Sequence, residues 1–140
     1  MKKKFILFIA VIFTLAMVSS AYAGKCPQPR KTKSAPGSIS KKDNTKKANK
    51  ANGEKLYQKK AKPMACKMCH GAKGGGDGKL GKALKPSPRD FTCKKTMKKV
   101  SAGQMYWIIK NGSKGTGMAP MKLKDKEIWD VIKYIREDLM

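Results

Sequence analysis

The sequence predicts an all-α domain of three to five short helices behind a disordered basic arm, and three observations indicate this fold. Apolar residues recur at helical spacing near the carboxyl end of the chain, whereas residues 24–50 contain almost none. Between these regions lies a glycine-rich stretch that cannot form regular structure. The chain has 140 residues, so we expect one folded domain, at residues 51–140.

Residues 1–23 have the pattern of a signal peptide. Three lysines at residues 2–4 precede a run at residues 5–18 that is apolar apart from one threonine, and Ala21 and Ala23 supply the small residues of a cleavage site. The run is shorter than the roughly 20 apolar residues of a membrane span, although an uncleaved anchor is the alternative. We therefore expect export, to the bacterial periplasm.

The segment at residues 24–50 is rich in lysine, proline, serine and asparagine. It holds nine basic residues and one acidic residue, and it offers no apolar core, which predicts a disordered basic arm. The whole chain has 33 basic and 9 acidic side chains and a net charge of +24. This charge should attract anionic partners, including an anionic membrane surface. Nucleic acid is not an expected partner, because an exported protein rarely meets it.

The first predicted helix of the folded domain covers Ala51–Ala61. It places Leu56 and Tyr57 on one side, and we expect Pro63 to end it. The stretch Gly71–Gly81 holds six glycines and is expected to be irregular.

A second helix is predicted over Gly103–Lys110, with four side chains available for burial: Met105, Tyr106, Ile108 and Ile109. The last helix begins where Asp125 can serve as its cap. Its apolar residues recur at helical spacing and are expected in the core: Ile128, Trp129, Val131, Ile132, Ile135 and Leu139. Its other face is expected to be polar, with Lys126, Asp130, Lys133 and Asp138.

One short motif carries the chemistry of the chain. Cys66, Cys69 and His70 occupy positions i, i+3 and i+4, which point the same way on one helical turn. Two thiols on that face can add to the two vinyl groups of a haem, and the adjacent imidazole can bind the iron as its proximal ligand. The spacing is the attachment signature of a c-type haem, and it occurs once, so we expect one covalently bound haem c.

Two other uses of this motif compete with haem. A thioredoxin-like pair needs a strand–helix setting, which the sequence does not predict. A zinc site needs a fourth ligand, and Cys26 and Cys93 are the other thiols. These two cysteines could instead form a disulfide or remain free, and the sequence leaves both options open.

The second axial ligand of the iron cannot be a histidine of the same molecule, because His70 is the only one. A methionine, a lysine or an open position remains, and a methionine thioether suits an electron carrier. Met118 lies in the stiff loop Gly115–Pro120, which can hold a thioether at the iron. Met118 is therefore the predicted distal ligand, and Met121 is the alternative.

The chain resembles the class I c-type cytochromes, in particular small bacterial monohaem forms and oxidase-associated cytochrome c domains. The resemblance covers residues 51–140 and rests on six segments: Asn52–Tyr57, Cys66–Gly71, Gly76–Gly78, Pro86–Phe91, Gly117–Pro120 and Lys124–Trp129. It implies a cytochrome c-like fold in which Gly53 allows the first and last helices to cross closely. Tyr57, Val131 and Tyr134 match the positions at that crossing.

The resemblance also implies roles for residues around the haem. Arg89 and Trp107 become candidate contacts to the haem propionates, and the carbonyl of Pro86 or Pro88 becomes the candidate that orients His70. Ala119 departs from the family pattern, because it separates Met118 from Pro120 where methionine and proline are often adjacent.

The predicted function is electron transfer by a monomeric carrier rather than enzymatic catalysis. Its expected partners are acidic redox proteins or a membrane oxidoreductase. Three alternatives are a haem subunit of a larger oxidoreductase, an open-site haem enzyme or gas sensor, and a polyanion-binding protein that uses the basic arm.

Overall fold

The carboxyl-terminal helix forms the centre of the fold. The computed structural model describes residues 26–29 and 32–140. In it, helix α6 (Asp125–Tyr134) continues into the π-helical turn η5 (Ile135–Leu139). The predicted apolar stripe is confirmed, because Ile128, Trp129, Val131, Ile132 and Ile135 are all buried and Leu139 packs against them.

Two details of α6 differ from the sequence prediction. The residue that caps the helix is Lys124, whose backbone N–H donates to the Glu127 carboxylate over 2.8 Å, and Asp125 is instead the first helical residue. Asp130, expected on the polar face, is fully buried. The reason is that helix α2 covers it and supplies hydrogen bonds to its carboxylate.

Helix α2 (Lys50–Lys55) continues into the π-helical turn η3 (Leu56–Lys60) and packs across α6. The side chain of Asn49 caps it by accepting the Asn52 N–H over 3.0 Å. The helix ends at Ala61, two residues before Pro63, so the first predicted helix is confirmed.

Helix α5 (Ala102–Asn111) is the third large helix and packs against α6. The hydroxyl of Ser101 caps it by accepting the Gln104 N–H over 3.1 Å. Tyr106 stacks on Trp129 of α6 with ring centroids 4.8 Å apart, which joins the two helices. The predicted helix over Gly103–Lys110 is therefore confirmed.

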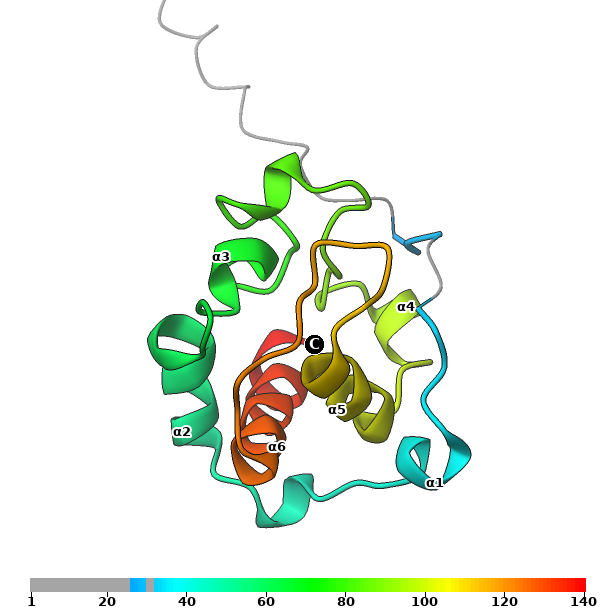
Figure 1. Cartoon of the computed structure of the whole chain (residues 1–140), viewed down its shortest axis with the longest axis vertical. Coiled ribbons are helices and arrows are strands. Elements are labelled where there is room, and N and C mark those ends of the chain that lie inside the picture. Colours follow the sequence, from blue (N-terminus) through cyan, green and yellow to red (C-terminus); the bar gives the residue numbers. More distant parts are fainter. Residues whose placement is uncertain (1–25, 30–31) are drawn as a thin grey trace, which may run out of the picture.

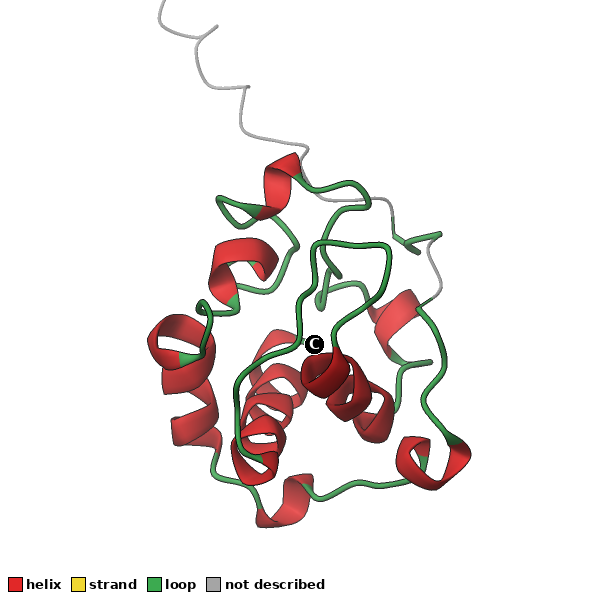
Figure 2. Ribbon diagram, in the orientation of Figure 1, coloured by secondary structure: helices red, strands yellow, loops and turns green. Residues whose placement is uncertain are grey.

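The remaining elements are single turns connected by long loops. They are α1 (Gly37–Ser40), η2 (Thr45–Lys47), α3 (Lys67–His70), η4 (Gly81–Ala83) and α4 (Lys94–Met97). Figures 1 and 2 show α5 and α6 near the centre of the view and α2 on the other side of α6, with no strand in the described part of the chain. The all-α prediction is confirmed. Among the described residues, the domain has five α-helices, α2–α6, within the predicted three to five, and α1 lies in the segment predicted as an arm.

The described part of that arm is ordered against the domain instead of disordered. The Ala35 N–H donates to the Gln104 side chain over 2.7 Å, and the Gln104 amide donates back to the Lys33 carbonyl over 3.0 Å. Cys26 and Cys93 form a disulfide, which settles the choice that the sequence left open. Composition does not reveal this order, because backbone hydrogen bonds and a covalent bond hold the segment rather than a large apolar face.

The predicted signal peptide, residues 1–23, lies outside the described residues. Within residues 26–29 and 32–140, none of the helices has the length and apolar character needed to cross a membrane.

Candidate haem site

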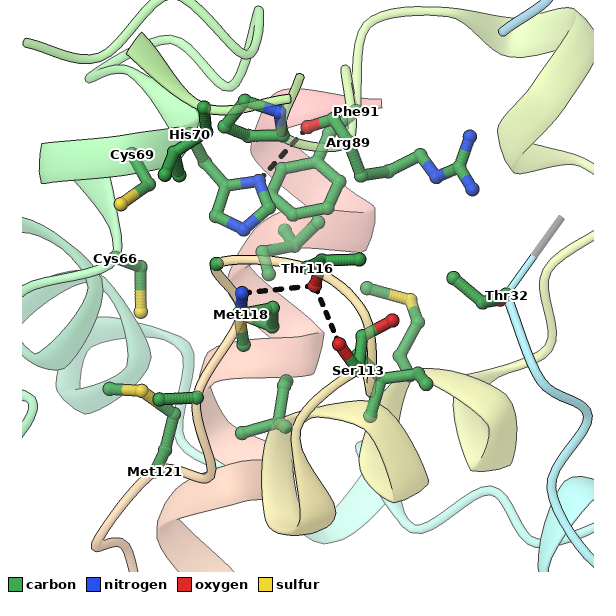
Figure 3. A pocket seen from close by; sticks show the side chains of 18 of the residues that line it. Thr32, Cys66, Cys69, His70, Arg89, Phe91, Ser113, Thr116, Met118 and Met121 are labelled. Carbon is green, nitrogen blue, oxygen red and sulfur yellow. Dashed lines mark hydrogen bonds between the residues drawn. The ribbon is translucent and has the colours of Figure 1, made fainter. Parts of the chain in front are cut away.

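The motif residues are brought together by the single turn of α3. The backbone N–H groups of Cys69 and His70 both donate to the Cys66 carbonyl, over 3.2 Å and 2.9 Å. This turn places Cys66, Cys69 and His70 on the wall of one cavity, as the spacing predicted (Figure 3). The turn ends at Gly71, whose φ of 81° favours glycine.

The glycine-rich stretch lies directly under this turn. The N–H groups of Gly76 and Gly78 donate to the carbonyls of His70 and Cys69, over 2.8 Å and 3.1 Å. A β-carbon at Gly78 would lie 2.5 Å from the carbonyl oxygens of both Lys67 and Met68. The glycines therefore let the loop approach the end of α3 closely and satisfy carbonyls that have no partner within the helix.

The two motif cysteines are free thiols in the described structure. Burial raises the pKa of Cys66 to about 12, and burial also raises the pKa of Cys69. Both groups are therefore protonated near neutral pH before any covalent attachment, so neither has the depressed pKa of a redox-active thiol.

The imidazole of His70 is fixed by two contacts. Its Nδ1 lies 2.9 Å from the carbonyl oxygen of Arg89, and its ring stacks on Phe91 with centroids 4.6 Å apart. A carbonyl oxygen can only accept, so Nδ1 carries the proton and Nε2 keeps its lone pair. Burial lowers the pKa of His70, which favours the neutral form that a metal needs.

The carbonyl that orients His70 belongs to Arg89 rather than to Pro86 or Pro88. The Pro88 carbonyl instead accepts a hydrogen bond from the Gln28 side chain over 3.0 Å. The sequence could not identify the correct carbonyl, because the choice depends on the path of an irregular loop.

Met118 lies on the wall opposite His70, in the loop after α5. Its carbonyl accepts from the Ser113 N–H over 2.8 Å, and its own N–H donates to the Thr116 hydroxyl over 3.0 Å. Figure 3 shows the His70 ring directed toward this loop, with Met121 further along the same wall. Both methionines line the cavity and are partly buried, so the structure brings the two candidate distal ligands to one site.

Apolar side chains form most of the remaining wall. They are Leu84, Phe91, Met97, Val100, Met105, Ile108, Ile109, Val131 and Ile135. A flat apolar macrocycle fits this lining, and the two thiols, the neutral imidazole and the thioethers are the donors that a covalently attached haem requires. The residues present therefore fit a c-type haem.

The two residues assigned to the haem propionates lie in different places. Arg89 lines the cavity, and its Nη1 donates to the Gln28 side chain over 3.1 Å. Trp107 is not brought to this cavity; it lines a second hollow beside Lys110 and Trp129.

The cavity also includes residues that the sequence analysis did not assign to it. Gln28 and Thr32 reach its wall from the segment predicted as an arm. Cys26 and Cys93 are the sequence feature from which the position of Gln28 and Thr32 could have been predicted. A disulfide between these two cysteines fixes the predicted arm beside the site.

The donor set does not favour zinc. Cys26 and Cys93 are joined to each other, so neither thiol is available as the fourth ligand. Among the described residues, no group of three or more histidine, cysteine or acidic side chains could hold a metal ion. Thioredoxin-like chemistry lacks its setting as well, since the described chain contains no strand.

Comparisons with known proteins agree with this geometry. A family model described as cytochrome c matches residues 50–137. No curated protein sequence matches the chain. Among solved structures, a chain of the reducing HAO-like protein complex of Kuenenia stuttgartiensis is similar, with 28% sequence identity and a TM-score of 0.53. The match covers 64% of this chain and 43% of that chain, so it spans less than half of the relative's length.

Proposed function

The chain belongs to the cytochrome c family, and on that premise we propose that it is a periplasmic monohaem electron carrier. The observation that carries the proposal is the cavity that His70 and Met118 line from opposite walls, with both motif thiols beside it. In this proposal Cys66 and Cys69 would hold one haem c through thioether bonds, and His70 and Met118 would bind its iron.

A bound haem c supplies an iron that alternates between two oxidation states and so carries one electron at a time. The chain's own residues hold the ligands still during that change. The Arg89 carbonyl and the Phe91 ring fix the His70 imidazole, and the bonds of Ser113 and Thr116 fix the Met118 loop. Because neither ligand has to move, little reorganisation accompanies each transfer.

The charge of the chain supports an acidic partner. The full sequence has a net charge of +24, and removing residues 1–23 takes away three lysines and leaves +21. This charge favours encounter with acidic redox proteins or with the acidic surface of a membrane oxidoreductase, and it also opposes association between two copies of the chain. We therefore propose a monomer that docks transiently. Export to the periplasm rests on the signal-peptide pattern of residues 1–23.

A second candidate function is that of a haem subunit in a larger oxidoreductase. It is favoured by the similarity to a chain of a reducing HAO-like protein complex. The two functions differ in how tightly the partner is held. A stoichiometric partner that co-purifies at high salt supports the subunit, whereas purification of the chain alone supports the carrier.

The proposal is tested with the full chain expressed together with a haem-attachment system. Intact mass should show one haem added to the chain from which residues 1–23 have been removed. A variant in which Cys66→Ser and Cys69→Ser are combined should lose the covalent haem, whereas Cys26→Ser with Cys93→Ser should retain it. Covalent haem in the first variant would contradict the assignment of the attachment site.

A further inference from the structure

The side chain of Gln28 contacts three consecutive residues of the loop beside His70. Its Nε2 donates to the Pro88 carbonyl over 3.0 Å. Its Oε1 accepts from the Arg89 guanidinium over 3.1 Å and from the Asp90 N–H over 2.9 Å. These contacts bracket the Arg89 carbonyl, which is the group that accepts the Nδ1 proton of His70.

Two prolines reduce the number of N–H groups that the loop can donate at this place. The loop is irregular from Lys85 to Asp90, and Pro86 and Pro88 have no N–H to donate. Gln28 therefore supplies, from another part of the chain, hydrogen bonds to the two peptide groups on either side of Arg89. One involves the Pro88 carbonyl, and the other involves the Asp90 N–H, which lies in the same peptide group as the Arg89 carbonyl.

Gln28 is itself held by two anchors on helix α4. Cys26 is bonded to Cys93, the residue that precedes the first turn of that helix. The backbone N–H of Gln28 donates to the Thr96 hydroxyl over 3.1 Å. Cys93 is buried, with 3% of its surface exposed, so the disulfide joins Gln28 to a fixed point of the domain. A tether of this kind lowers the entropy lost when the glutamine is placed against the loop.

We propose that Gln28, tethered by the Cys26–Cys93 disulfide, is a positioning residue for the axial ligand His70. It acts through the Arg89 carbonyl, because a rigid acceptor keeps the Nδ1–H bond short and aligned. That bond makes the imidazole a stronger donor to the iron, which stabilises the oxidised state. The inference rests on the proposed function, in which His70 binds the haem iron.

The test compares holoproteins carrying Gln28→Met, which keeps the side-chain length and removes the hydrogen bonds, with the wild type. Proton NMR of the reduced protein measures how fast the His70 Nδ1–H exchanges with solvent. We expect exchange to be about tenfold faster in the variant, the change that corresponds to losing one good hydrogen bond. The midpoint reduction potential should become more positive, because a weaker Nδ1–H bond makes His70 a poorer donor to the iron. A residue that only stabilised the fold would give no reason for a change of this sign.

Gln58→Met is the matched control. Gln58 also makes two side-chain hydrogen bonds, to the Ala72 carbonyl and the Tyr134 hydroxyl, but it does not contact the loop at residues 88–90. In Gln58→Met, the exchange rate of the His70 Nδ1–H and the midpoint reduction potential should equal those of the wild type. A variant combining Cys26→Ala with Cys93→Ala loses the tether and should change both readouts in the same direction as Gln28→Met.

The proposal would be overturned if Gln28→Met had the same His70 Nδ1–H exchange rate and the same midpoint potential as the wild type, even if both values changed in the cysteine variant. If Gln28→Met did not mature, wild-type values in the cysteine variant would overturn it instead. Failure of the proposed function is recognised separately. In that case the ring protons of His70 in the reduced wild-type protein would lack the shifts caused by a bound haem, before any variant is compared.

Discussion

Gly53 of α2 lies directly against the backbone carbonyl of Asp130 in α6. A β-carbon at Gly53 would collide with that carbonyl oxygen, and the flanking nitrogen of Val131 would lie 3.0 Å away. The two helix backbones are therefore in contact at this point, as the resemblance to the class I cytochromes c implied for Gly53. Tyr57 and Tyr134 pack beside the crossing with ring centroids 5.4 Å apart, and the Tyr57 hydroxyl donates to the Gly71 carbonyl over 2.8 Å. The crossing thus fixes the position of the haem motif.

Replacing Gly53 should destabilise the fold strongly. Gly53→Ala forces the two backbones apart, because the atom that it meets is main chain and cannot rotate away. We expect a loss of about 3 kcal/mol in the free energy of unfolding, measured by denaturant titration of the holoprotein. Gly37→Ala is the control, since nothing lies within 4 Å of the added carbon, and it should change stability by less than about 0.5 kcal/mol. Equal losses in the two variants would contradict a contact specific to the crossing.

The carboxylate of Asp130 should make stability depend on acid pH. Burial alone would raise its pKa, but hydrogen bonds from the Asn49 N–H, the Asn52 amide and the Lys126 ammonium lower it below 3.8. A carboxyl group with a depressed folded-state pKa contributes stability that is present above its unfolded pKa. This contribution is lost as the pH falls through the lower folded-state value.

We therefore expect Asp130→Asn to cost about 1–3 kcal/mol at pH 7 and progressively less below pH 3.8. Unfolding free energies of the wild type and of Asp130→Asn, measured from pH 7 to pH 2, should converge as the pH falls. Asp138→Asn, which removes an exposed ion pair with Lys50, should shift the curve little at any pH. A difference between Asp130→Asn and the wild type that stayed constant with pH would refute this account.

Local patterns in the sequence were sufficient for the three longest helices and for the motif, although not for the single turns α1 and α4. Residues such as Ile128 and Val131 follow one another at helical spacing, and Cys66 and His70 lie on one turn, so short-range rules predict their environment. Asp130 could not be predicted, because its partners lie on a helix about 80 residues away in sequence. Gln28 was missed for the same reason, since its loop contacts span at least 60 residues.

The choice between Met118 and Met121 as distal ligand is decided by exchanging each in turn. Met118→Ala should open an axial position, so the reduced holoprotein should bind carbon monoxide at least about tenfold more tightly than the wild type. Its reduction potential should fall, because a thioether ligand raises the potential. Met121→Ala should change neither property, as its backbone is held separately by a hydrogen bond to the Ile109 carbonyl. The reverse pattern would assign Met121, and tight binding in the wild type would indicate an open site.

The positive charge of the protein should speed electron transfer to an anionic oxidant and slow electron transfer to a cationic one. The net charge of +21 that remains without residues 1–23 attracts ferricyanide, an anion, and repels a cationic cobalt complex. Raising the ionic strength shortens the Debye length from about 10 Å at 0.1 M to about 3 Å at 1 M. Stopped-flow oxidation of the reduced protein should therefore slow with salt for ferricyanide and accelerate for the cobalt complex.

Charge reversal at single lysines locates the surface through which electrons leave. Lys85 is exposed and lies between the cavity residues Leu84 and Pro86, whereas Lys55 is exposed at the end of α2, outside the cavity wall. Lys85→Glu and Lys55→Glu change the net charge equally, so a difference between them reports position rather than total charge. We expect Lys85→Glu to slow the ferricyanide reaction at low salt by about two- to fivefold more than Lys55→Glu, because Coulomb energy falls with distance. Equal effects would mean that only the overall charge of the protein matters.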